Sequence, residues 1–190
     1  KQIIGDCLVD NDVKVDDLPF FDVDYLFVAL RAKSVSETIE MNFVCNNVVN
    51  EQKCGHIFPV VLDIANVEIA KDEKLKDKID FGNSTGVKMK YPKYSDMKRI
   101  FSDESDVDRI LRLVYNSVDY IYQKETVFNM RDYSKEDFDK WIEGLTKAQF
   151  DKLEEWVLNL PSFSVSAKQN CVKCGFEHNV KYKDFESFFL

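Results

Sequence analysis

Histidine is scarce in this chain of 190 residues, in which His56 and His178 are the only two. Catalysis by a Ser or Cys nucleophile needs a base beside it, most often histidine, and a third group that orients this base. The sequence offers very few positions from which such a set of residues could be built. The shortage of histidine therefore leaves little room for nucleophilic chemistry.

An excess of positive charge is also missing. Lys and Arg number 26 against 34 for Asp and Glu, which gives a net charge of −8 and a sequence pI of about 4.9. Binding to nucleic acid or to an anionic membrane surface depends on clustered Lys and Arg. We therefore expect no nucleic acid and no membrane among the main partners of the protein.

Long apolar runs are absent as well, so no segment is expected to cross a bilayer. The first residues contain no apolar stretch of the kind that a secretory signal needs. The chain has five cysteines, an odd number, and Cys7 stands apart from the other four. Together these features indicate a reducing cytoplasm, in which thiols stay unpaired.

The other four cysteines form two pairs that lie far apart in the sequence. The second cysteine of each pair is followed by glycine, and a short apolar stretch precedes each pair. This layout is typical of zinc knuckles, in which a strand, a tight turn and a second strand present two thiolates to one metal. The sequence therefore predicts one structural Zn²⁺ held by four thiolates: Cys45, Cys54, Cys171 and Cys174.

The two pairs differ in spacing. Cys171 and Cys174 have the usual two intervening residues, whereas Cys45 and Cys54 have eight. An inserted polar loop is therefore expected at residues 46–53.

Other interpretations of these residues stay open. His56 and His178 each follow a cysteine pair, and either can replace one thiolate to give three Cys and one His. The four cysteines can also be reduced and metal-free, since cysteine serves as a small buried apolar residue. A redox Cys-x-x-Cys would have to open a helix, whereas Cys171 and Cys174 lie between strand-like runs.

The predicted zinc site is closed to substrates. A catalytic zinc keeps one ligand position open and is held by His, Asp or Glu ligands in most enzymes. Four thiolates fill the coordination shell, and both histidines lie next to the expected metal. We therefore predict a protein without enzymatic activity.

Periodicity predicts the elements around the first cysteine pair. Residues 1–17 are polar and strand-like at most, whereas residues 18–31 are apolar nearly all round, which predicts a helix buried on more than one side. Residues 38–45 alternate between apolar and polar and predict the strand that enters the pair. Residues 57–64 predict the strand that leaves it.

Two further β segments are expected. Residues 79–92 predict a hairpin whose turn, Gly82–Gly86, lacks the Gly-Lys-Ser/Thr end of a phosphate-binding loop. Strands at 164–166 and 179–182 are expected to flank the second cysteine pair.

From residue 93 onward the apolar spacing becomes helical. A short helix is expected near 94–101 and a longer one at 107–121. Ser134 is expected to cap a third helix, and a capping box that begins at Thr146 to open a fourth.

The predicted fold class is α+β. A small antiparallel zinc-ribbon-like β part, at about 36–91 and 162–183, joins both chain ends, and a helical subdomain at about 93–161 forms the middle. The whole chain, 1–190, is expected to form a single domain, because the metal connects its beginning to its end.

Five stretches form a pattern that extends over most of the chain. They are Leu18–Phe27, Leu30–Ser34, Val87–Pro92, Cys171–Gly175 and Phe185–Phe189. Taken together they resemble the baseplate hub proteins of contractile-tailed, T4-like bacteriophages. The resemblance implies a small non-enzymatic protein of the central hub of the tail baseplate, or a factor that acts during hub assembly. It also implies a location in the virion tail and, during assembly, in the host cytoplasm.

The last residues are too apolar to remain in water, and they pack onto the chain's own helices or dock into a partner. The large apolar residues of this tail are Phe185, Phe188, Phe189 and Leu190. With the resemblance, the expected partners are other phage baseplate hub and tail proteins. The alternative function is a zinc-ribbon adaptor for nucleic acid or transcription machinery, although Lys and Arg are interspersed with acids throughout the chain.

Overall fold

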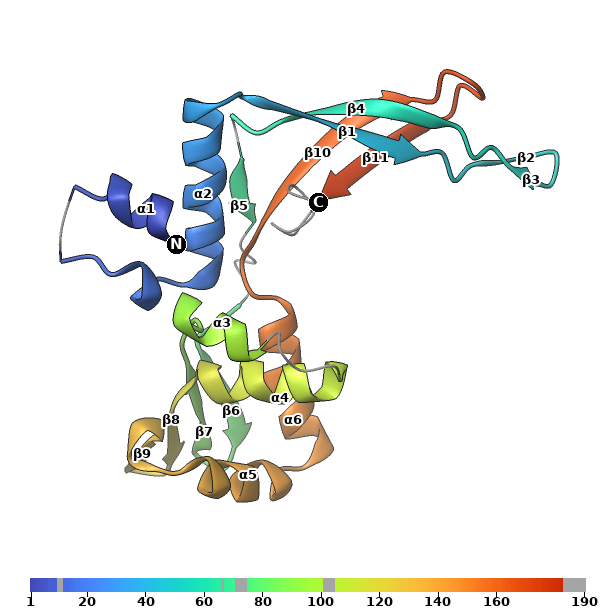
Figure 1. Cartoon of the computed structure of the whole chain (residues 1–190). Coiled ribbons are helices and arrows are strands. Elements are labelled where there is room, and N and C mark those ends of the chain that lie inside the picture. The colour runs from blue at the N-terminus through green and yellow to red at the C-terminus, as the bar shows by residue number, and fades with distance from the viewer. Residues whose placement is uncertain (10–11, 66, 71–74, 101–104, 183–190) are drawn as a thin grey trace. The chain divides into compact units, whose positions relative to one another are not determined.

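The computed structural model of the protein describes residues 1–9, 12–65, 67–70, 75–100 and 105–182. Its helices and strands, labelled in Figure 1, form two compact units. The first unit comprises the described residues within Lys1–Cys7, Phe21–Ala70 and Ser162–Leu190, and the second those within Leu8–Phe20 and Lys71–Pro161. Within the described ranges, no helix combines the length and the apolar character needed to cross a membrane.

The first unit contains three small antiparallel sheets. Strand β1 pairs with β4, β2 pairs with β3, and β10 lies between β11 and β5. The bounds are β1 Thr38–Val44, β2 Val48–Val49, β3 Gln52–Lys53, β4 Ile57–Asp63, β5 Glu68–Ala70, β10 Ser162–Asn170 and β11 Glu177–Tyr182. The strands predicted on both sides of each cysteine pair are therefore confirmed.

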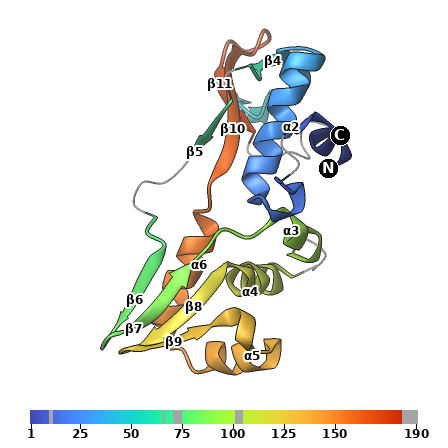
Figure 2. The ribbon, with the colours of Figure 1, turned by 90° about the vertical axis from the view of Figure 1, so that its left-hand side faces the viewer.

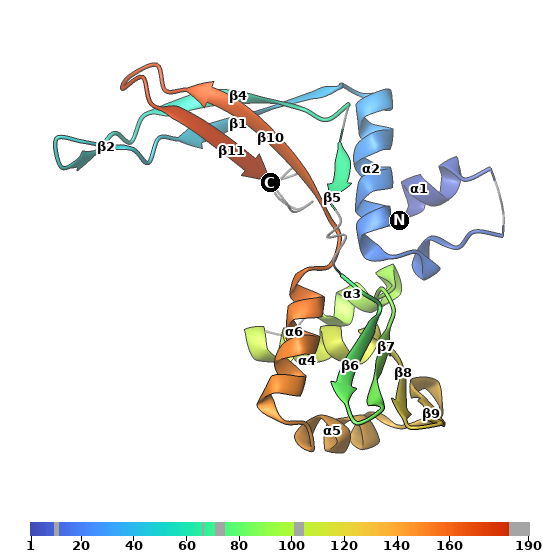
Figure 3. The same cartoon turned by 180° about the vertical axis from the view of Figure 1, so that it is seen from behind.

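The core of the first unit follows from the alternation in its strands. In β4, Phe58, Val60 and Leu62 are buried between exposed neighbours. They share one apolar cluster with Phe163 and Val165 of β10, and Figure 3 shows β10 and β11 next to the β1–β4 pair. Because successive side chains of a strand point to opposite faces, one apolar face of each sheet is enough to build this core.

Helix α2 (Phe20–Ser34) is buried on more than one side, as predicted. Phe21 and Val23 are both buried, although residues two positions apart point to nearly opposite sides of a helix. The expectation for residues 1–17 is wrong, because α1 (Gln2–Cys7) is a helix and η1 (Val15–Asp17) is a 3₁₀ turn. Each buries one apolar side chain, Ile4 and Val15, and this tertiary burial outweighs the weak local alternation.

The second unit is built on a four-stranded antiparallel sheet in the order β6-β7-β8-β9, seen side by side in Figure 2. The strands are β6 Lys78–Gly82, β7 Thr85–Met89, β8 Val118–Gln123 and β9 Thr126–Asn129. The predicted hairpin is confirmed as β6–β7. Its turn residues Asn83 and Ser84 have φ values of 52° and 59°, as a tight two-residue hairpin turn requires.

The second unit also contains helices. They are α3 Tyr94–Ile100, α4 Asp106–Ser117, α5 Lys135–Glu143 and α6 Lys147–Leu158, with the 3₁₀ turn η2 Met130–Asp132 before α5. Both predicted caps are confirmed: Ser134 and Thr146 each form a capping box, with Asp137 and Gln149 respectively. Buried side chains of α4, α5 and α6 form a second apolar cluster with Val87 and Met89 of β7 and Val118 of β8.

The helix predicted at 107–121 ends too late in the sequence. Helix α4 stops at Ser117, and Val118 to Gln123 form β8, which pairs with both β7 and β9. Val118 and Ile121 fit helical spacing from Val114, but β-branched and aromatic residues also favour a strand. Backbone hydrogen bonds to two neighbouring strands decide between these options, so the middle of the chain combines helices with a sheet.

Gly86 lies at a point of this sheet where no side chain fits. A Cβ atom there would overlap the Ile79 carbonyl oxygen of β6 and the hydroxyl end of Tyr122 of β8. The Tyr122 hydroxyl donates to that same carbonyl oxygen at 3.5 Å, so its ring lies across the glycine. The glycine therefore allows an aromatic side chain to cover two strands at once.

We predict that Gly86→Ala lowers the free energy of unfolding by about 2–3 kcal/mol, because the new methyl group forces Tyr122 and β6 apart. Urea denaturation followed by circular dichroism measures the change. Gly144→Ala, at the end of α5 in the same unit, is the control. Its Cβ meets only ordinary contacts and its backbone is already helical, so stability should stay the same or rise by up to about 1 kcal/mol. Equal effects of the two substitutions would contradict this account.

Candidate metal centre

The first cysteine pair lies in a tight backbone turn between β1 and β4. The Cys45 N–H donates to the His56 carbonyl oxygen at 2.8 Å, and the Gly55 N–H donates to the Cys45 carbonyl oxygen at 3.0 Å. Gly55 has a φ of 61°, a left-handed conformation that costs other L-residues about 1–2 kcal/mol. The glycine therefore lets the chain reverse directly after the second cysteine.

The second pair, between β10 and β11, has the same hydrogen-bonded frame. The Cys171 N–H donates to the Phe176 carbonyl oxygen at 2.9 Å, and the Gly175 N–H donates to the Cys171 carbonyl oxygen at 2.8 Å. Gly175 also has a positive φ, 72°. The two Cys-Gly patterns of the sequence thus fold into two equivalent turns, as the knuckle pattern predicts.

The longer spacing of the first pair comes from a small hairpin inserted into this frame. The expected loop is more ordered than predicted, because β2 and β3 pair through Val48 with Lys53 and Val49 with Gln52. The Cys54 N–H donates to the Asn47 carbonyl oxygen at 2.8 Å, which closes the base of the hairpin. Residues 48–53 are therefore an insertion into a turn that otherwise resembles the Cys171–Cys174 turn.

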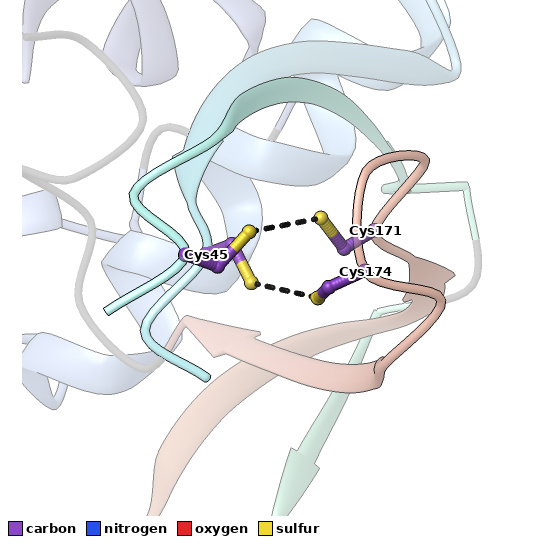
Figure 4. A group of neighbouring side chains, drawn as sticks. Cys45, Cys171 and Cys174 are labelled. Atoms are coloured by element: carbon purple, nitrogen blue, oxygen red, sulfur yellow. Dashed lines mark hydrogen bonds between the residues drawn. The ribbon is translucent and has the colours of Figure 1, made fainter. Parts of the chain in front are cut away.

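The four sulfur atoms of the two turns converge. All four lie within 4.8 Å of one another, with Cys45 and Cys174 at 3.6 Å and Cys54 and Cys171 at 3.9 Å. Figure 4 shows Cys45 facing the turn that carries Cys171 and Cys174. A tetrahedron with metal–sulfur bonds of about 2.3 Å has edges of about 3.8 Å, whereas a disulfide requires about 2.05 Å. The arrangement matches a set of metal ligands and not a pair of disulfides.

Side chains of each turn also bind the other turn. The Asn47 side-chain amide donates to Cys174 Sγ at 3.6 Å, and Lys173 Nζ donates to the Cys54 carbonyl oxygen at 3.3 Å. No local sequence pattern points to these two residues, because neither residue type is a metal ligand and their contacts span more than 100 positions. They hold the turns against each other without entering the ligand set.

The two histidines differ in their place at the site. His178 is 5% exposed, and its Nε2 lies 3.1 Å from Cys45 Sγ. His56 is partly exposed and stacks on the ring of Phe58 at 6.3 Å. Among the described residues, the group whose ligand atoms all converge contains the four cysteines and neither histidine. The inward position of His178 could have been inferred from its alternation with Val180 along β11.

The surroundings of the thiols shift the pKa values of Cys45 and Cys174 in opposite directions. Burial raises the pKa of the Cys45 thiol to about 12, and the backbone N–H of Asn47 offsets this only in part. The backbone N–H of Phe176 lowers the pKa of Cys174 to about 6, against the opposing effect of burial. Four thiolates cannot coexist at these distances without a compensating cation, whereas a bound divalent ion favours deprotonation of all four.

The segment Gly82–Gly86 has the letters Gly-Asn-Ser-Thr-Gly, which match the Gly-x-Ser-x-Gly pattern of hydrolase nucleophiles. In those enzymes the serine stands on a sharp turn from a strand to a helix. Here Ser84 is exposed at the tip of the β6–β7 hairpin, so the segment leads from strand to strand. The structure supports the hairpin-turn interpretation of this segment.

The aromatic tail formed by Phe185, Phe188, Phe189 and Leu190 lies outside the described residues. Its expected role in partner binding therefore rests on the sequence.

Comparison with known proteins gives one family. The family model described as "T4 bacteriophage base plate protein" matches residues 1–190, the whole chain. No curated protein and no solved structure matches the chain. The family match confirms the resemblance to T4-like baseplate proteins that the sequence pattern indicated.

We predict that removal of residues 48–53, which joins Asn47 directly to Cys54, leaves the centre intact. The shortened turn has the same Cys-x-x-Cys-Gly spacing as the second one, so the same backbone frame can form. The variant should bind Co²⁺ with an affinity within about 10-fold of the full chain, measured by absorption titration. A loss of binding would show that the hairpin is part of the frame and not an insertion.

Proposed function

Because this chain belongs to the T4 bacteriophage base plate protein family, we propose that it is a non-enzymatic component of the central hub of a contractile-tail baseplate. It acts there as a structural part or during hub assembly. The observation that carries the proposal is the family match over the whole chain. A closed cysteine cluster, which leaves no ligand position for a substrate, supports a role without catalysis.

The second part of the proposal is that one structural zinc stabilises the fold. Cys45, Cys54, Cys171 and Cys174 are the proposed ligands. Four mutually close sulfurs in two glycine-containing turns fit tetrahedral Zn²⁺ better than oxygen-preferring ions such as Mg²⁺ or Ca²⁺. With the metal bound, the β part of the first unit is zinc-ribbon-like.

A bound metal would cross-link distant parts of this chain. The sulfur contacts join positions that are 117 and 129 residues apart, so the ion closes very long loops. Cross-linking of distant segments reduces the conformational entropy of the unfolded chain. A component of an assembled tail gains from this, because its surface keeps one shape while other proteins bind to it.

We expect Cys171→Ser to release the metal and to lower the melting temperature by roughly 10 °C, because the site contributes several kcal/mol of folding free energy. Elemental analysis should give one zinc per chain for the unmodified protein and a clear loss for the variant. Cys7→Ser is the matched control, since Cys7 is exposed and lies outside the cluster. Unchanged zinc content in Cys171→Ser would refute the proposed ligand set.

The location of the protein tests the baseplate role. Mass spectrometry of purified virions should detect the chain if it is a structural part, whereas detection only in infected lysate assigns it to assembly in the host cytoplasm. In both cases, affinity capture from infected cells should bring down other baseplate proteins. Capture without any baseplate protein would contradict the hub proposal.

The proposed contact with other hub proteins is the apolar tail, Phe185, Phe188, Phe189 and Leu190. We expect the double substitution Phe188→Ala and Phe189→Ala to weaken capture of baseplate proteins by about 10-fold or more, since aromatic anchors dominate many interfaces. The melting temperature should stay within about 2 °C of the unmodified protein. A large fall in melting temperature would instead place these residues in the chain's own core.

A further inference from the structure

His178 is an unusual side chain for the interior of this protein. At 5% exposed it is, with Ser117, one of two buried polar residues among those that the structure describes. Aromatic rings lie close around its imidazole, at centroid distances of 5.2 Å for Phe43, 5.8 Å for Phe58 and 4.8 Å for Phe176. Burying a polar ring among apolar groups costs free energy unless a hydrogen bond compensates.

The compensating contact is with the metal centre. His178 Nε2 lies 3.1 Å from Cys45 Sγ, and Cys45 itself is 1% exposed. The contact connects the two cysteine turns, because β11 begins after the second turn and carries His178 back to the cysteine of the first. The three rings pack around the imidazole while its Nε2 faces the sulfur.

We propose that His178 is a positioning residue of the metal centre, donating a hydrogen bond from Nε2–H to the Cys45 thiolate without binding the metal. This inference rests on the metal site of the proposed function and adds a role that the four ligands do not supply. A metal-bound thiolate has only acceptor lone pairs, so the nitrogen that faces it has to carry the proton.

The role follows from the charge of a four-thiolate site. A divalent ion neutralises half of the thiolate charge, and the remainder is buried with the sulfurs. Donated N–H groups stabilise that remaining charge, and such contacts commonly change metal affinity by about 10–100-fold. Cys45 also receives the backbone N–H of Asn47, so its sulfur is held by one donor from the first turn and one from β11.

The geometry also argues against His178 as a ligand. The four sulfurs lie within 4.8 Å of one another, two of their separations match a tetrahedral edge at 3.6 and 3.9 Å, and His178 approaches one sulfur at hydrogen-bond distance. A ligand nitrogen would have to replace one of these sulfurs about 2.0–2.1 Å from the ion. The histidine that the sequence left as an alternative ligand thus acquires a different function.

The test uses the full chain loaded with Co²⁺, whose visible bands report ligand number and whose near-ultraviolet bands report thiolate-to-metal charge transfer. His178→Leu should keep the visible bands of a four-thiolate site. Its charge-transfer bands should shift to lower energy, because a thiolate without the N–H donor is easier to oxidise. Zinc affinity, measured by competition with a chelator, should fall by about 10-fold or more.

Two further variants separate this role from simple packing. His178→Gln places an amide donor at similar reach and should restore most of the affinity and the band position. His56→Leu, at the other histidine, should leave both unchanged. Visible bands that indicate a lost ligand in His178→Leu would make His178 a ligand and overturn the proposal. Unchanged charge-transfer bands and affinity would overturn it as well.

A measurement on the unmodified protein covers the case in which His178→Leu does not fold. Nitrogen-15 NMR of the zinc-loaded chain should show His178 with its proton on Nε2 and none on Nδ1. A proton on Nδ1 alone would overturn the proposal. Failure of the unmodified chain to bind Co²⁺ or Zn²⁺ is a different result, because it overturns the metal site itself and this role with it.

Discussion

The structure of the first unit depends on the close approach of four sulfur atoms from two distant parts of the chain. Four thiols this close cannot all ionise without a cation, burial raises the pKa of Cys45 as well, and the sulfurs do not form disulfides at these distances. A divalent cation would resolve the conflict, because it would bind all four thiolates at once. The β1–β4 and β10–β11 pairs lead into and out of the two turns, so the position of each turn follows from the strand pair that carries it.

The two turns show how one backbone frame accepts different sequences. Hydrogen bonds from the first cysteine and from the glycine are the same in both, although one turn has two residues between its cysteines and the other has eight. The extra residues form the β2–β3 hairpin, whose base is closed by the Asn47–Cys54 hydrogen bond. Family membership places this chain among the proteins of the T4-like phage baseplate.

Much of the fold was predictable where the signal is local. The capping boxes at Ser134 and Thr146, the β6–β7 hairpin and the alternating strands each depend on residues a few positions apart, and all are present. The helix that was expected to reach Ile121 ends at Ser117 instead, since its last residues fit a strand equally well. The N-terminal helix was missed because a single buried side chain, Ile4, leaves no periodic pattern in six residues.

The sequence by itself determined which residues can form the cysteine turns, because the Cys-Gly pattern encodes both the thiol groups and the positive φ that each turn needs. Only the tertiary structure decided that the two turns meet and that His178 faces Cys45 while His56 does not. It also decided that Gly86 makes room for Tyr122. The physical reason is separation along the sequence. The hydrogen bonds and φ angles of a turn depend on residues a few positions apart, whereas these contacts join residues 36 to 133 positions apart, which only the folded core brings together.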